Sequence, residues 1–381
     1  MKVQCFIVES LKNIDAQINA SRVGGFAPTL GIAFASVNFG IEPLSEALGK
    51  YNDISFLGAS TDGEIIANGE GTVVHEGTAA ISLIDCDKEA FRLQLFRGNG
   101  KKSFDVGQEV ANWGVKQFAR PGFIVASGGL HADGDEFLKG IISVAGPDTP
   151  VFGGLAGDNK AFKTTFAFTN GQHTTDGIAA LVLDTDKIEL DGIAIGGWSG
   201  IGAEKTITKA EGNVVYTIDN EPAMEVYKKY LSITDNDLPQ IGVEYPLMLT
   251  RDDGSSILRA VMDVKRDTGA LVFAGTVPQG SRVRFSSSSG VDVIEQVKRD
   301  LDAYGKKHPQ ADHLILFSCM ARHLALGPMI DEEILAAYEK WNVPLIGFFS
   351  YGEIGKGLTG KCDFFNETFA LATLREKAKQ L

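Results

Sequence analysis

Two stretches of this sequence decide the fold, because they spell the same turn twice: GASTDGEI at residues 58–65 and GFFSYGEI at residues 347–354. Each begins with Gly, ends in Gly-Glu-Ile and follows a short apolar segment. A second apolar run comes after each turn, TAAISLI at residues 78–84 and TFALATL at residues 368–374. Agreement over so many aligned positions indicates an internal repeat.

A third, weaker copy lies between these two. Its parts are FIVAS at residues 123–127, VFGGLAGDN at residues 151–159 and GIAALVL at residues 177–183. Each copy has the pattern of an apolar strand, a helix, a second strand that ends in a glycine-rich turn, and a hairpin. The three helices are predicted at residues 43–48, 135–144 and 331–341. Strand, helix and strand form a parallel pair with a crossover, and hairpins add antiparallel strands. The predicted fold class is therefore α/β (α+β), with mixed β-sheets flanked by helices.

The stretch between residues 192 and 290 departs from the repeat. It contains strand-like runs separated by good hairpin turns at residues 252–254 and 267–269. Asn220-Glu221-Pro222 reads as a turn into a helix. We place the domain boundary here, which divides the chain into an N-terminal domain of residues 1–222 and a C-terminal domain of residues 223–381.

Composition and charge exclude several function classes. The 381 residues carry 36 Lys and Arg against 49 Asp and Glu, a formal charge of −13, so no diffuse positive field would attract nucleic acid or an anionic membrane. The longest apolar runs are too short for a membrane helix, and no export signal is visible. The four cysteines stand far apart without metal-ligand spacing. We expect a cytoplasmic protein without membrane insertion, nucleic-acid binding or structural zinc.

Carboxylates occupy the strand ends where a crossover sheet presents a crevice for ligands. Glu64 and Glu353 hold equivalent places in two copies, and Asp158 with Asn159 is the polar pair of the third. Paired carboxylates can perform acid and base work. The interpretation we favour is that each accepts backbone N–H hydrogen bonds from the glycine turn that it follows. A carboxylate there could equally receive the amino group of a small zwitterionic ligand.

The segment SCMARH at residues 318–323 directly follows another predicted strand. Arg322 suits the anionic group of a ligand, because its guanidinium is planar and charged. Cys319 beside an arginine is the best nucleophile candidate, although a free buried Cys is commonly a small hydrophobe. His323, and His131 in the corresponding loop of the middle copy, are candidate haem ligands, although loop histidines are more often solvent-exposed.

These residues and the stretches around them resemble the FIST sensory domain, with its N-terminal and C-terminal halves. The matching elements include residues 58–65, 151–159, 221–231, 273–280, 317–322 and 347–354, with Asn366-Glu367-Thr368 near the end. The resemblance covers residues 28–374. One departure is Ala321, where the family commonly has Gly before the arginine. The ligand-binding residues expected on this basis are Ser60, Glu64, Gly154, Asp158, Asn159, Cys319, Arg322, Ser350, Glu353 and Asn366.

The resemblance implies a non-enzymatic, intracellular ligand-sensing module of free-standing bacterial type. Its ligand would be an amino acid or a similar small molecule. Its expected partner is a separate histidine kinase or cyclic-di-GMP signalling protein, and no cofactor is expected. Two alternatives stay open: a haem-based nitric-oxide sensor that regulates a histidine kinase and uses His323 and His131, and an enzyme that uses Cys319 or the Glu64 and Glu353 carboxylates.

Overall fold

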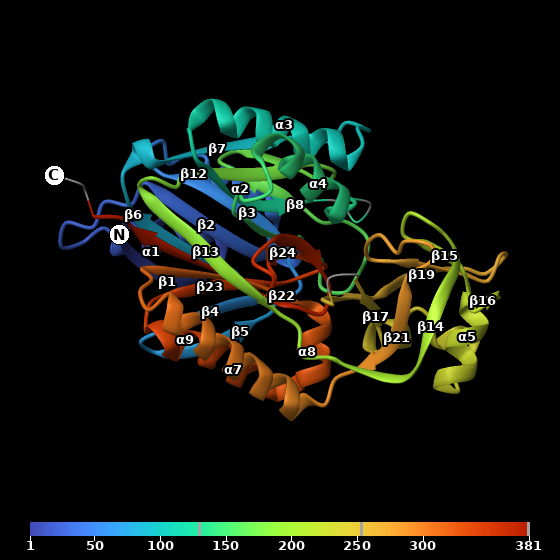
Figure 1. Ribbon diagram of the computed structural model, residues 1–381. Coiled ribbons are helices and arrows are strands. Elements are labelled where there is room, and N and C mark those ends of the chain that lie inside the picture. The colour runs from blue at the N-terminus through green and yellow to red at the C-terminus, as the bar shows by residue number, and fades with distance from the viewer. Residues whose placement is uncertain (129, 131, 252–253, 379–381) are drawn as a thin grey trace.

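The computed structural model describes residues 1–128, 130, 132–251 and 254–378, and in these residues the chain forms a large body and a smaller lobe (Figure 1). The body contains three six-stranded sheets, and the lobe is built on a fourth sheet of eight strands. Helices cover the outer faces of the body, as the ribbon shows (Figure 1). The predicted fold class, mixed sheets flanked by helices, is confirmed.

The three sheets of the body are built from strands that are widely separated in sequence. In spatial order, the first sheet is β1 (Lys2–Val8), β6 (Ala79–Asp85), β2 (Leu30–Ser36), β3 (Ser55–Thr61), β10 (Ala167–Thr169) and β11 (Gln172–Thr174). The second is β7 (Phe91–Phe96), β12 (Ile178–Asp184), β8 (Pro121–Ser127), β9 (Val151–Leu155), β24 (Glu353–Lys356) and β25 (Cys362–Phe365). The third is β13 (Ile188–Ile195), β26 (Phe369–Glu376), β22 (His313–Cys319), β23 (Leu345–Ser350), β4 (Glu64–Asn68) and β5 (Gly71–His75).

Each of these sheets has the same parts in the same order. A parallel pair lies in the middle, β2 with β3, β8 with β9, and β22 with β23. The hairpin at one end of each sheet comes from another segment of the chain, since β4 pairs with β23, β10 with β3, and β24 with β9. The glycine-rich turns therefore carry the chain from one sheet to the next. They meet in the body, where the amide of Asp62 donates to the carbonyl of Phe349 and that of Gly157 to the carbonyl of Ser60.

Two glycines show why these turns need the residues they have. Gly63, between β3 and β4, has a φ of +125°, a conformation that side chains with a Cβ rarely adopt. A Cβ at Gly352 would lie 2.5 Å from the ring of Phe364. Between the sheets, the rings of Phe34, Phe317 and Phe348 pack together with centroids 4.6 to 6.3 Å apart. The strands β2, β22 and β23 therefore share an aromatic core.

The helices predicted at residues 43–48, 135–144 and 331–341 are present, with slightly different ends. The body helices are α1 (Ile14–Ser21), α2 (Ile41–Leu48), α3 (Ser103–Gln117), α4 (Gly134–Ala145), α7 (Gly290–Lys307), α8 (Met320–Leu326) and α9 (Ile330–Trp341). The remaining α-helices of the described residues are α5 (Ala223–Leu231) and α6 (Gln240–Glu244). Helix α8 begins directly after β22, so Arg322 and His323 lie on a helix instead of in a loop.

The lobe is inserted between β13 and α7. In spatial order its sheet contains β18 (Ser256–Arg259), β17 (Leu247–Thr250), β21 (Arg282–Ser287), β14 (Ser199–Glu211), β15 (Val214–Ile218), β20 (Ala270–Phe273) and β19 (Val261–Lys265), with β16 (Glu221–Pro222) paired to β15. Residue 222 lies inside this lobe, so both sequence halves contribute to it. The division of the chain at that residue stays a prediction. Residues 252 and 253, in the hairpin turn predicted at 252–254, lie outside the described residues.

Candidate functional site

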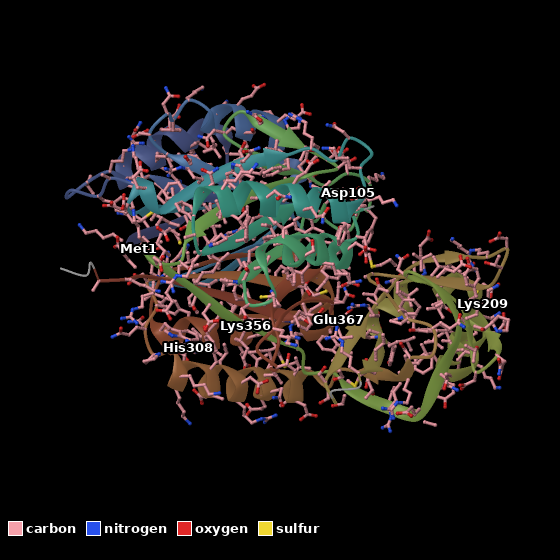
Figure 2. All side chains as sticks on the ribbon, turned by 45° about the horizontal axis from the view of Figure 1, so that its top comes forward. Met1, Asp105, Lys209, His308, Lys356 and Glu367 are labelled. Atoms are coloured by element: carbon pink, nitrogen blue, oxygen red, sulfur yellow. The ribbon has the colours of Figure 1, made fainter. Side chains whose placement is uncertain are left out.

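A small cavity, partly open to solvent beside Phe162, lies where the lobe meets the body; we call it the interlobe cavity. Its volume is about 20 Å³, just above the roughly 10–15 Å³ that one water molecule requires. The body lines it with Phe162, Cys319, Met320, Ala321, Tyr351, Asn366 and Glu367, and the lobe with Val243, Ala260, Met262 and Ala274. Figure 2 shows Glu367 at the junction of the two parts.

Glu367 is the most unusual side chain of this cavity. It has 0% exposure, and neither oxygen of its carboxyl group has a hydrogen-bond partner. A buried carboxylate without a partner is strongly disfavoured, and burial raises the pKa of Glu367 to about 8 against the opposing effect of Arg322. The backbone of Glu367 is also in the left-handed region, with a φ of +58°. Such strain persists only where the surroundings enforce it, often at ligand sites.

Asn366 and Cys319 lie on the same wall of the cavity. The side-chain oxygen Oδ1 of Asn366 is buried and has no partner. The pKa of the Cys319 thiol lies well above its usual range because of burial and because the carboxyls of Glu353 and Glu367 are close. A thiol in that environment is protonated at neutral pH and is a poor nucleophile.

Tyr351 forms the wall next to Phe162 and connects the cavity to the glycine-rich turns. Its ring stacks on that of Phe162 with centroids 4.8 Å apart, and Phe162 is 44% exposed. The Tyr351 hydroxyl donates to Asp158 over 2.6 Å and accepts the amide N–H of Lys160 over 3.0 Å. Behind it lies Asp62, whose oxygen Oδ2 has no partner and whose pKa is raised to about 7, mainly by burial.

Arg322 is fully buried and its guanidinium is already engaged. Both carboxyl oxygens of Glu333 accept hydrogen bonds from it, and both residues have side chains with 0% exposure. Its Nη1 also donates to the carbonyls of Gly196 and Glu367, at 2.5 and 2.9 Å. These contacts tie the linker into the lobe, the backbone of Glu367 and helix α9 together. The ligand contact predicted for Arg322 stays a prediction, and the geometry favours a positioning role.

Glu64 and Glu353 each hold their own turn. Glu64 accepts hydrogen bonds from the hydroxyl of Thr61 and from the hydroxyl and amide of Thr78. Glu353 accepts them from the hydroxyl of Ser350 and the amide of Thr368. Both carboxyls make structural contacts, but the donors differ from those predicted. The glycine turns supply the hydroxyls of Thr61 and Ser350, and the backbone amides come from Thr78 and Thr368, which lie outside those turns.

The other predicted ligand residues also serve the turns. The Asp158 carboxylate accepts three backbone N–H bonds from residues 162–164. Ser60 donates to the carbonyl of Gly157 over 2.7 Å, and the amide of Asn159 donates to Ser36 over 2.8 Å. A Cβ at Gly154 would lie 3.1 Å from Phe317 and Ser350, so this glycine allows close packing.

Of the two predicted haem ligands, only His323 lies among the residues that the structure describes. His131 lies outside the described residues. The ring of His323 stacks on Phe349 with centroids 4.3 Å apart, and its Nδ1 is buried without a partner. Burial lowers the pKa of His323. Among the described residues, no group of three or more His, Cys, Asp or Glu side chains is arranged to hold a metal ion.

The sequence predicted two residues that line the interlobe cavity, but it did not predict Glu367. Asn366 and Cys319 are predicted ligand residues, and Glu367 follows Asn366 in the motif Asn366-Glu367-Thr368. Tyr351 and Asp62 lie inside the repeated turns, which is the signal that could have identified them. No pattern marked the lobe residues Ala260 and Met262.

Other hollows are larger, but their chemistry is less distinctive. One of about 380 Å³ lies beside β8 and the start of α3 and includes Lys101 and Thr164. None of the described residues that line it has a buried side-chain polar atom without a partner. Among all the residues that the structure describes, no helix is long and apolar enough to cross a membrane. The interlobe cavity is therefore the strongest candidate site.

Comparison with known proteins places these features in a family context. The pattern of the FIST N domain matches residues 29–221, and that of the FIST C domain matches residues 223–356. An uncharacterized protein of Methanocaldococcus jannaschii is 27% identical over an alignment of 237 residues that covers 54% of this chain and 44% of that protein. Uncharacterized proteins of Mycobacterium bovis and Mycobacterium tuberculosis are each 21% identical over 221 residues, 55% of this chain and 56% of theirs. The chain spans about half the length of the curated relatives it matches.

Proposed function

We propose, from the premise that this chain belongs to the FIST family of sensory domains, that it binds a small organic ligand in the interlobe cavity. The observation that carries the proposal is that Glu367 lines the cavity and that its carboxyl group is buried without a hydrogen-bond partner. The amino group of an amino acid or of a related amine would supply the missing hydrogen-bond donors.

The position of the cavity couples ligand binding to the lobe. A cavity of about 20 Å³ admits only a small group unless the lobe moves away from the body. Among the described residues, polar contacts between the lobe and the body include the Arg251 to Asp363 ion pair and a 3.1 Å hydrogen bond from Arg259 to the carbonyl of Phe364. A ligand that binds better to one lobe position shifts the population toward it. We propose that a separate histidine kinase or cyclic-di-GMP signalling protein detects this shift.

The chemistry of the cavity supports a sensor more than an enzyme. A nucleophilic mechanism needs an activated nucleophile with a base beside it. The Cys319 thiol is buried, and nearby carboxyls raise its pKa further. The Glu64 and Glu353 carboxyls are each occupied by the turns they hold. No described residue of the cavity wall is a histidine.

A haem-based sensor is the second candidate, because the Nδ1 of His323 is buried without a partner. The described surroundings do not fit haem, since the cavity against helix α8 is about 20 Å³ and the ring of His323 is stacked on Phe349. An absorption spectrum of protein produced with a haem precursor decides this point. A Soret band that moves with nitric oxide and disappears in His323→Ala would replace the proposal above.

The proposal is tested by thermal-shift screening of amino acids, amines and carboxylates, followed by calorimetry of the hits. Ala260→Leu fills the cavity from the lobe side and is expected to abolish binding while the protein still unfolds cooperatively. Ala16→Leu, on an exposed face of α1, is the matched control and should bind normally. Hits that bind equally well to Ala260→Leu would place the ligand elsewhere and refute the proposal.

Movement of the lobe requires its own measurement. Asp105 on the body and Lys209 on the lobe are both exposed (Figure 2), so spin labels attached through D105C and K209C report their separation. A ligand from the screen is expected to change the distance distribution. An unchanged distribution at saturating ligand would refute the proposed coupling while leaving the binding site intact.

A further inference from the structure

The unpartnered polar atoms of the residues that line the interlobe cavity are all oxygen atoms. The two carboxyl oxygens of Glu367 and the Oδ1 of Asn366 are buried and without partners. The Oδ1 of Asn366 accepts hydrogen bonds, and the Glu367 carboxyl accepts them at both oxygens once it has lost its proton. The described residues that line the cavity include no Lys, Arg or His. What the cavity lacks is therefore a donor, and the charge that would complement it is positive.

We infer that the ligand is a small organic ammonium ion without a carboxylate, and that its ammonium group binds between Glu367 and Asn366. The inference rests on the proposed function, because it takes the interlobe cavity to be the ligand site. An ammonium group offers up to three N–H donors, which matches the three acceptor atoms available. Hydrogen bonds between charged groups are the stronger ones, and burial strengthens them further.

The surroundings disfavour a carboxylate on the same ligand. The guanidinium of Arg322 is occupied by Glu333 and by two backbone carbonyls. Lys160 directs its amine to Glu76, 3.7 Å away. A ligand carboxylate would instead approach Glu367, with Glu353 nearby, and like charges in a buried interface are strongly unfavourable. An amino acid should therefore bind more weakly than the amine that lacks its carboxylate.

The size and lining of the cavity agree with this class of ligand. An ammonium group is about as large as a water molecule, and the cavity of about 20 Å³ accommodates one. Val243, Met262 and Ala274 on the lobe side are apolar. A short alkyl chain attached to the ammonium group would contact these residues once the lobe shifts outward. Apolar contact and a few well-placed polar groups are the usual composition of small-molecule sites.

Proton release gives the inference a distinctive signature. Without ligand, burial keeps the pKa of Glu367 near 8, with Arg322 opposing the shift and with Cys319 and Glu353 as the other ionisable neighbours. The carboxyl group is then mostly protonated at pH 7, whereas an ammonium ion favours its ionised form. Binding at pH 7 should release up to one proton. Calorimetry in two buffers of different ionisation enthalpy measures this number directly.

The test compares three probes that differ in charge: n-butylamine, 4-aminobutyrate and butyrate, each titrated into the full chain at pH 7. We expect n-butylamine to bind with proton release, 4-aminobutyrate to bind more than about tenfold more weakly, and butyrate not to bind. Glu367→Gln should weaken n-butylamine binding by more than about tenfold and abolish proton release. Glu64→Gln, which changes another buried carboxyl away from the cavity, is the matched control and should retain both.

The outcomes separate this inference from the proposed function. Tighter binding of 4-aminobutyrate or butyrate, lost in Ala260→Leu, would overturn the ammonium inference and leave the interlobe site in place. Equal binding of n-butylamine to Glu367→Gln and to the unchanged chain would also overturn it. If none of the three probes binds, the ammonium inference falls; the proposed function then depends on the wider screen with Ala260→Leu.

Discussion

Glu64 and Glu367 are two carboxyl groups with the same burial and opposite surroundings. Each has 0% exposure, and burial raises the pKa of Glu64 to about 7 and that of Glu367 to about 8. Glu64 accepts three hydrogen bonds from Thr61 and Thr78, whereas Glu367 accepts none. Burial alone therefore does not distinguish a structural carboxyl from a functional one. The hydrogen-bond partners of each group distinguish them.

Three other carboxyl groups of the body resemble Glu64, because each accepts hydrogen bonds from the protein. Asp158 is satisfied by three backbone amides, Glu353 by Ser350 and Thr368, and Glu333 by Arg322. These groups lie within the body, where the turns and helices meet. Glu367 lies at the junction with the lobe instead (Figure 2). The chain itself supplies donors to these carboxyls. Among the described residues, Asp62 keeps one carboxyl oxygen without a partner, and Glu367 keeps both.

The largest effect is expected where a partnered carboxyl loses its partner. Arg322→Ala leaves Glu333 buried without a counter-charge and frees the carbonyls of Gly196 and Glu367. Breaking such a pair costs about 3–5 kcal/mol of unfolding free energy. Urea denaturation measures the loss. The double variant Arg322→Met with Glu333→Leu removes both charges and should recover most of the stability. If Arg322→Ala were as stable as the unchanged chain, the contrast between carboxyls with and without hydrogen-bond partners would have no energetic basis.

A smaller loss is expected for Glu64→Gln. The amide group of Gln would present N–H donors to Thr61 or Thr78, which are donors themselves. Leaving a buried donor unsatisfied costs about 1–3 kcal/mol. Thermal unfolding at pH 6 should show a clearly lower Tm. Glu42→Gln, an exposed position on α2, controls for the change of charge and should leave Tm almost unchanged.

The repeated turns made the body predictable. GASTDGEI and GFFSYGEI led to the correct fold class, to the crossover helices and to the interpretation of Glu64 and Glu353 as turn-holding residues. Local spacing sufficed because Thr61 and Ser350 lie three positions before the glutamates they bind. The exchange of hairpins between sheets could not be predicted, because a hairpin pattern is the same whichever sheet it joins.

The interlobe cavity could be predicted only in part, for two physical reasons. Val243, Ala260, Met262 and Ala274 are separated from Glu367 by more than ninety positions, and their apolar side chains are ordinary core residues in sequence. The partner of Arg322 is Glu333, eleven positions away; the two residues lie on different helices, α8 and α9, so their contact depends on how these helices pack. Arg322 therefore looked available for a ligand when it was already occupied.

The pH dependence of stability should distinguish the two carboxyls. A carboxyl whose pKa is raised by folding holds a proton that the unfolded chain has released, so stability falls as pH rises. For Glu64 and Asp62 this fall ends near pH 7, and for Glu367 it continues to about pH 8. One group contributes at most about 1.4 kcal/mol per pH unit. Urea midpoints measured from pH 5 to pH 9 should decline up to pH 8, and Glu367→Gln should flatten the part between pH 7 and pH 8.

The smallest effect is expected for Glu367→Gln at pH 6, and it is the sharpest contrast with Glu64→Gln. Below its pKa of about 8 the carboxyl group of Glu367 is neutral, as the amide of Gln is, and the two side chains have nearly the same shape. No hydrogen bond is broken, because neither oxygen has a partner, so unfolding free energy should change by less than about 0.5 kcal/mol. Urea denaturation of both variants at the same pH measures the difference. A loss above about 1 kcal/mol at Glu367 would show that its carboxyl is held by the protein, and the distinction between a partnered and an unpartnered site would then disappear.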